Sequence, residues 1–174
     1  MCLAIQKKAS KISIQKQAVA KTSRTLLLEI PAVEIPAVTV ENALPDTLIN
    51  KVKDEALQNR LREIRENPAT IDDHIASGWL KGYTALHMAA AWTDEHEVLL
   101  GLLAAGANKD LKNNDGETPL HIAVKEGNQA IVDALIKEGA NVNQQNVLGE
   151  TPLHIAVYYS HQAIVEALKR EKAV

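Results

Sequence analysis

The residues best suited to chemistry in this chain are its six histidines, its single cysteine and a few neighbouring carboxylates. Imidazoles and carboxylates together serve as acid–base groups or as ligands for a metal such as zinc. Two short runs have that composition: Asp-Asp-His at 72–74, and His96 followed by Glu97. A zinc-protease helix needs its second histidine at position 100, where Leu100 stands. The run at 72–74 therefore predicts a solvated polar turn, and neither run predicts an active site.

The other common catalytic signals are missing from the sequence. Cys2 is the only cysteine, so no intrachain disulfide can form, and a reducing, intracellular setting is favoured. No GxxxxGK[ST], GxGxxG, GxSxG or CxxC pattern occurs, and these patterns mark phosphate, dinucleotide, serine-hydrolase and thiol or zinc sites. The sequence predicts no catalytic residue, no metal site and no cofactor.

Three of the histidines recur at one position of a repeated motif. The copies read GYTALHMAAAW from Gly82, GETPLHIAVKE from Gly116 and GETPLHIAVYY from Gly149, with spacings of 34 and 33 residues. Stacked helices lie about 8 to 10 Å apart, whereas nitrogens that share a zinc ion each lie about 2.1 Å from it. His87, His121 and His154 are therefore expected to be structural and not to share an ion.

Each copy encodes a pair of short helices. In the second copy, Thr118 can cap a helix, and Pro119 occupies the first helical position, where a missing N–H costs nothing. Gly127 permits a tight turn into a second helix, which Gly139 closes. Since one such pair cannot bury its own apolar face, the copies must stack into a solenoid.

This pattern resembles the ankyrin repeat, whose signature is T-P-L-H-x-A with a 33-residue period. Residues 118–123 and 151–156 match the signature in full, whereas the first copy has Ala85 in place of proline and one more residue between Trp92 and Glu97. The third copy has Ser160 where Gly127 stands. The resemblance implies an all-α ankyrin-repeat solenoid, with repeats at 82–115 and 116–148 and a C-terminal capping repeat at 149–174.

The capping character of the last copy rests on Lys169. It stands where the earlier copies have Leu103 and Ile136 on the stacked face of the second helix. A polar residue there is typical of a solenoid end.

Residues 46–81 are predicted to form a capping helix or degenerate repeat at the start of an ankyrin domain spanning 46–174. Asp46 can cap a helix from about Thr47 to Glu66, which Pro68 ends. Seven apolar residues follow helical spacing in it: Leu48, Ile49, Val52, Ala56, Leu57, Leu61 and Ile64. From Leu57 onward the sequence resembles the second helix and exit turn of a preceding repeat.

Residues 1–45 are predicted to be an extended or disordered arm and linker. Residues 1–28 carry six Lys or Arg residues and no acidic residue, although the whole chain has a net charge of −3. The pentapeptide EIPAV occurs at 29–33 and again at 34–38, and its prolines exclude a helix. The arm is open to three interpretations: a solvated tail, a targeting signal, or a contact to nucleic acid or anionic lipid.

The resemblance implies a protein that binds another protein through a concave face lined by the loop tips and the first helix of each repeat. Alignment of the three copies places Trp92, Glu126 and Tyr159 at equivalent positions, in one row of that face, and Lys125 and Tyr158 in the next row. Exposed Trp and Tyr are enriched among interface hot spots. The alternative for the aromatic residues is packing between repeats. The predicted partner-binding residues are Tyr83, Trp92, Lys112, Asn113, Lys125, Glu126, Asn146, Tyr158 and Tyr159.

The expected setting follows from the same observations. Charges at the loop tips are mixed, which argues against nucleic acid, and no apolar stretch of about 18 residues is present to span a membrane. The sequence therefore predicts a monomeric cytoplasmic adaptor or regulator. Two alternatives remain open. The arm can be the address of a translocated bacterial effector, secreted into a host cell, or of a mitochondrial regulator, and the chain can be a subunit whose catalytic partner is separate.

Overall fold

The computed structural model describes residues 39–76, 78, 80–92 and 96–172 of the 174. Every regular element in that part of the chain is a helix, and these residues belong to one compact unit that begins at Val38. The basic arm, the two EIPAV segments, Cys2, Trp79 and the additional residue expected after Trp92 lie outside the described residues.

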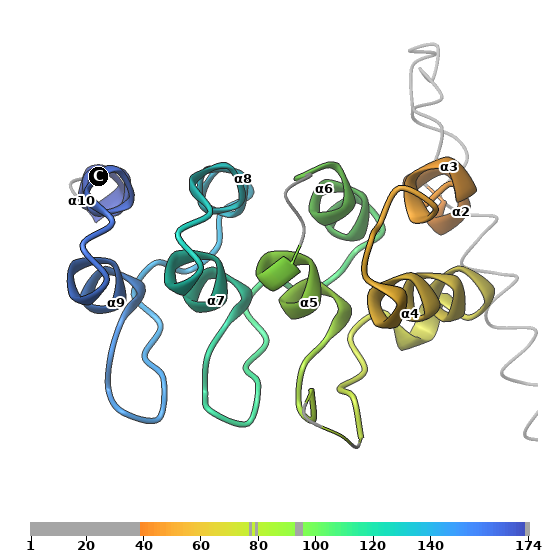
Figure 1. Cartoon of the computed structure of the whole chain (residues 1–174), viewed down its shortest axis with the longest axis horizontal. Coiled ribbons are helices and arrows are strands. Elements are labelled where there is room, and N and C mark those ends of the chain that lie inside the picture. Colours follow the sequence, from red (N-terminus) through yellow and green to blue (C-terminus); the bar gives the residue numbers. More distant parts are fainter. Residues whose placement is uncertain (1–38, 77, 79, 93–95, 173–174) are drawn as a thin grey trace, which may run out of the picture. The chain divides into compact units, whose positions relative to one another are not determined.

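Three helix pairs stack side by side, as the repeats predict. The first helices α5, α7 and α9 form an inner row and the second helices α6, α8 and α10 form an outer row, each packed on its neighbour (Figure 1). Polar loops at 105–118 and 138–151, called fingers below, project from the inner row. The bounds are α5 Ala85–Trp92, α6 His96–Ala104, α7 Pro119–Lys125, α8 Gln129–Lys137, α9 Pro152–Tyr158 and α10 Gln162–Lys172.

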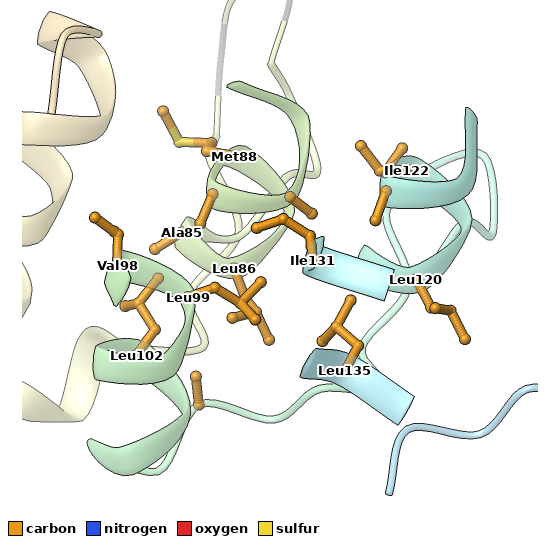
Figure 2. Close-up of a cluster of buried hydrophobic side chains, with 14 of the residues drawn as sticks. Ala85, Leu86, Met88, Val98, Leu99, Leu102, Leu120, Ile122, Ile131 and Leu135 are labelled. Atoms are coloured by element: carbon orange, nitrogen blue, oxygen red, sulfur yellow. The ribbon is translucent and has the colours of Figure 1, made fainter. Parts of the chain in front are cut away.

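The apolar core runs through the stack and is shared between neighbouring pairs. Leu86 and Leu99 of the first pair lie beside Ile131 and Leu135 of the second, and all four are at most 1% exposed (Figure 2). Burying one such side chain contributes roughly 1.5 to 3 kcal/mol. Much of the stability of each pair therefore comes from its neighbour, which confirms the predicted solenoid.

The second and third repeats begin with the predicted cap. Thr118 and Thr151 stand at the N-caps of α7 and α9 with proline in the first helical position. Each threonine forms a capping box with the histidine three residues later, His121 or His154. The T-P-L-H motif therefore encodes a complete helix start.

The single helix predicted from Thr47 to Glu66 is wrong, because two helices are present, α3 (Asp46–Ile49) and α4 (Glu55–Glu66). Asp54, and not Asp46, caps the long helix, since its Oδ1 accepts the Leu57 N–H at 2.8 Å. At the break, the Gln58 side chain donates to the Val52 carbonyl. The break lets the apolar residues on its two sides face different neighbours: α3 packs on α6 and α4 packs on α5.

The boundary predicted at residues 45 and 46 also lies too late. A short helix α2 (Val40–Ala43) packs on α4 and α6, and Leu44 is fully buried. The close approach depends on Gly101 in α6, because a Cβ there would lie 2.6 Å from the Ala43 carbonyl oxygen. Residues 39–45 therefore belong to the folded unit and not to the arm.

The order of helices in this N-terminal cap is reversed relative to the repeats. The long helix α4 lies in the inner row against α5, and the earlier helices α2 and α3 lie in the outer row against α6 (Figure 1). The interpretation of the segment after Leu57 as a second, outer helix is therefore wrong. Arg60 fastens α4 to the loop after it by donating to the Thr70 and Asp73 carbonyls, near the short 3₁₀ turn Pro68–Thr70.

The turn between the two helices of a repeat requires a left-handed residue. Gly127 has φ 71°, and a Cβ there would lie 2.7 Å from Cε1 of His161 in the next repeat. In the third repeat Ser160 adopts the same conformation, with φ 59°, and its N–H donates to Val157 at 3.1 Å just as Gly127 donates to Val124. The repeat geometry therefore imposes on a serine a conformation that favours glycine.

We expect Ser160→Gly to stabilise the chain by about 1 kcal/mol, because glycine adopts φ > 0 without a Cβ penalty. The measurement is the free energy of unfolding in urea. Gly127→Ser is the matched reverse change, and it should destabilise by more than Ser160→Gly stabilises, since it also meets His161. An unchanged stability of the Ser160→Gly chain would contradict the argument.

Candidate protein-binding surface

An asparagine holds the tip of each finger in shape. Oδ1 of Asn146 accepts the N–H groups of Leu148 and Glu150 at 3.0 and 2.9 Å, and its amide donates to the Glu150 carboxylate at 3.0 Å. Asn113 makes the equivalent bonds in the preceding finger and is buried. Asn113, which the sequence predicts as a partner contact, therefore uses both ends of its amide inside the turn. Asn146 is half-buried and uses its amide in the same way.

Neighbouring loops are joined by hydrogen bonds. Asp72 accepts the Asn108 N–H at 2.8 Å, and Nε2 of His74 lies 3.0 Å from the Lys112 carbonyl oxygen. The Asp-Asp-His run at 72–74 thus contacts the backbone of the next finger. Further along, the Val147 N–H donates to the Asp115 carbonyl at 3.0 Å. The fingers form a continuous bonded edge.

The repeated histidines connect each helix pair to the finger of the next. Nδ1 of His87 accepts the Thr84 N–H at 3.2 Å, so the other nitrogen, Nε2, carries the proton and donates to the Glu117 carbonyl at 3.0 Å. His121 repeats the arrangement with Thr118 and with the Glu150 carbonyl, at 3.1 and 3.3 Å. These bonds require the neutral ring. The histidines therefore set the position of Glu117 and Glu150.

Burial keeps these rings neutral. It lowers the pKa of His87 to about 4 and also lowers the pKa of His121. Within the described ranges no three His, Cys, Asp or Glu residues are grouped so as to hold a metal ion.

A groove of about 410 Å³ lies between the last two fingers and the ends of α7 and α9. We call it the finger groove. Its lining includes Lys125, Tyr158 and Tyr159, which the sequence placed on the inner face, and Asn146. The remaining lining residues are Asp115, Glu117, Val147, Leu148, Glu150 and Ile155.

The two tyrosines dominate the open side of the finger groove. Tyr158 is 79% exposed and Tyr159 is 44% exposed, and their rings meet edge to face with centroids 5.0 Å apart. Tyr159 also stacks on His161, with ring planes 10° apart. Since His161 packs on Gly127, the Tyr159 ring is supported from behind.

The remaining predicted residues lie away from the groove. Tyr83 and Trp92 are half-buried and pack against the core, as the packing alternative expected, and burial raises the pKa of Tyr83. Glu126 and Lys112 are exposed but do not line the groove. Sequence reasoning missed Glu117 and Glu150, although the glutamate after the glycine recurs in both GETPLH copies.

The comparison with known families agrees with this geometry. A family model described as ankyrin repeats (3 copies) matches residues 86–174, which is just over half of the chain. The chain belongs to the ankyrin-repeat family. Ankyrin repeats are generally protein–protein interaction modules without catalytic activity.

Several curated ankyrin-containing proteins are similar over short stretches. The nuclear factor NF-kappa-B p110 subunit of Drosophila melanogaster is 44% identical over 55 residues, which is 32% of this chain and 6% of that protein. Rabankyrin-5 of Mus musculus is 44% identical over 55 residues, which is 32% of this chain and 5% of that protein. The neurogenic locus notch homolog protein 1 of Danio rerio is 32% identical over 97 residues, or 56% of this chain and 4% of that protein.

The chain thus spans only a small part of the length of these relatives, so the likeness concerns the ankyrin repeats themselves. Among the helices that the structure describes, none is long and apolar enough to cross a bilayer.

We expect stability to fall as the pH decreases from about 6.5 to 4, by roughly 1 kcal/mol per pH unit for His87. The sign follows because the unfolded histidine takes up a proton near pH 6.5, whereas the folded ring resists it until about pH 4. Urea unfolding at several pH values measures the slope.

The comparison variant is His87→Gln, which removes the titrating ring. Between pH 4 and 6.5, the free energy of unfolding should change more steeply with pH in the wild-type chain than in the variant. Parallel slopes for the two chains would show that His87 does not carry the effect.

Proposed function

We propose that this ankyrin chain is a non-enzymatic adaptor or regulator that binds a protein partner in the finger groove. The observation that carries the proposal is the exposed tyrosine pair, Tyr158 and Tyr159, at the mouth of a groove lined by the fingers and the ends of the inner helices. Tyrosine combines a large apolar area with a polar hydroxyl, and it is enriched among the residues that dominate binding energy.

The support behind Tyr159 favours tight binding. Because the ring already stacks on His161, it loses little conformational freedom when a partner covers it. Val147 and Leu148 add apolar surface on the finger side, since they are 68% and 77% exposed. The partner would thus meet aromatic groups on one wall and aliphatic groups on the other.

The flanks of the proposed interface are the other predicted inner-face residues. Glu126 is exposed one residue after Lys125, Trp92 is the equivalent residue of the preceding repeat, and Lys112 lies exposed on a finger. We propose that these residues contribute rim contacts to a monomeric cytoplasmic module, with Tyr158 and Tyr159 at the centre.

Replacing Tyr158 and Tyr159 together by alanine should reduce partner capture at least tenfold, because hot-spot truncations cost about 2 kcal/mol or more each. The measurement is quantitative mass spectrometry of proteins that copurify with the full chain from cells of its source. Helical circular dichroism checks the fold.

Two further variants sharpen the result. The pair Lys137→Ala and Glu138→Ala removes two exposed side chains at the end of the outer helix α8 and should leave capture unchanged. Trp92→Ala with Tyr159→Ala should also lose capture if the row along the inner face is continuous. Undiminished capture by the folded tyrosine variant would refute the proposed site.

A further inference from the structure

The second and third repeats differ in one charge within the finger groove. In the second repeat the Lys125 ammonium lies 3.7 Å from Glu117 Oε1, and the Asn113 amide donates to the same carboxylate. The Glu117 carboxylate raises the pKa of Lys125. Glu117 is therefore matched by a cation from its own repeat.

In the third repeat the glutamate is kept and the cation is replaced. Glu150 is equivalent to Glu117, but Tyr158 stands where Lys125 stands. The Glu150 carboxylate accepts one hydrogen bond, from the Asn146 amide at 3.0 Å. Across residues 39–172, as far as they are described, no Lys, Arg or His side chain forms an ion pair with it. A carboxylate thus faces the groove without its countercharge.

The charge of the finger groove favours a cation. Three carboxylates line it, from Asp115, Glu117 and Glu150, against the single ammonium of Lys125, which Glu117 already pairs. A carboxylate beside aromatic rings offers a cation both a charge-assisted hydrogen bond and a ring face. An anionic partner group would meet no unpaired cation in the groove lining.

We propose that the finger groove binds an arginine side chain from a basic segment of a partner protein, with its guanidinium between the Glu150 carboxylate and the rings of Tyr158 and Tyr159. Arginine suits the site better than lysine, because its planar fork can bond a carboxylate through two N–H groups while its face stacks on a ring. This inference rests on the proposed function and specifies the chemistry of the partner.

The arginine neutralises the Glu150 carboxylate as the Lys125 ammonium neutralises that of Glu117 one repeat earlier. The partner thereby supplies the cation that the third repeat lacks, and the groove volume of about 410 Å³ accommodates a side chain with its flanking backbone. Much of the selectivity comes from Glu150, since leaving a charged group unpaired on binding is costly.

The test uses the full chain labelled with ¹⁵N and a blocked peptide, acetyl-Gly-Ser-Arg-Ser-Arg-Gly-Ser-amide. A second peptide carries citrulline, a neutral isostere, at both arginine positions. We expect the arginine peptide to shift the amide resonances of Gly149, Glu150 and Tyr158. The citrulline peptide should bind about tenfold more weakly, as expected for loss of a charge-assisted contact.

Two variants test the role of the charge. Glu150→Gln keeps the hydrogen bond to Asn146 but removes the charge, and it should weaken arginine-peptide binding about tenfold. Tyr158→Lys restores the pair seen in the second repeat, and it should weaken binding at least as much. Glu138→Gln makes the same charge change on an exposed residue at the end of the outer helix α8 and should leave binding unchanged.

Equal binding of the two peptides, or wild-type binding by the folded Glu150→Gln or Tyr158→Lys chain, would overturn the proposal. So would the absence of groove shifts with the arginine peptide. A dimer in light scattering, with groove amides that do not respond to the peptide, would assign the groove to a second copy instead. If peptide binding fails while the Tyr158 and Tyr159 variant still loses partner capture, the proposed function stands and only the partner's chemistry is wrong.

Discussion

The fold depends on one constraint: a pair of helices with seven to eleven residues each cannot remove its apolar side from water alone. Leu86, Leu99, Ile131 and Leu135 are buried only because neighbouring pairs lie against each other. The fingers and the inner row are therefore held by a core that lies behind them. Because the shared core holds this surface, its side chains keep fixed positions along the stack. A partner can therefore be recognised by residues from several repeats.

A second, polar set of contacts fixes the register of the stack. Apolar packing alone tolerates sliding, whereas the bond from His87 to the Glu117 carbonyl joins one repeat to a particular atom of the next. The asparagines at 113 and 146 then fix the finger from within. The repeated histidines, which look reactive in the sequence, thus fix how the repeats stack. The glutamates whose carbonyl groups they bond, Glu117 and Glu150, line the finger groove.

The fold could be predicted from the sequence because each repeated residue has a structural role that depends on its near neighbours in the chain. Thr118, for example, caps a helix, and Gly127 forms the turn after it. The N-terminal cap could not, because its apolar spacing fits one long helix, and only Asp54 and Gly101 signal the break and the close approach of α2. Alignment of the repeats placed Tyr158 and Tyr159 on the inner face, and both line the finger groove. It could not show that the Asn113 amide is used inside its turn, or that Glu117 has an ion pair that Glu150 lacks. Both depend on which side-chain atoms meet, between residues four positions apart in the first case and eight in the second.

The reversed cap gives the array a direction. Because α4 and α2 occupy the inner and outer places next to the first pair, a copy of the repeat joined ahead of Ala85 would have to displace them. At the opposite face Val157 is 58% exposed, whereas its counterpart Val124 is fully buried, and His154 is exposed with the donor geometry that His121 uses toward the next repeat. A further repeat added by protein engineering is therefore blocked ahead of α5, and beyond α10 it also requires an apolar residue in place of Lys169, which stands where the earlier pairs have Leu103 and Ile136.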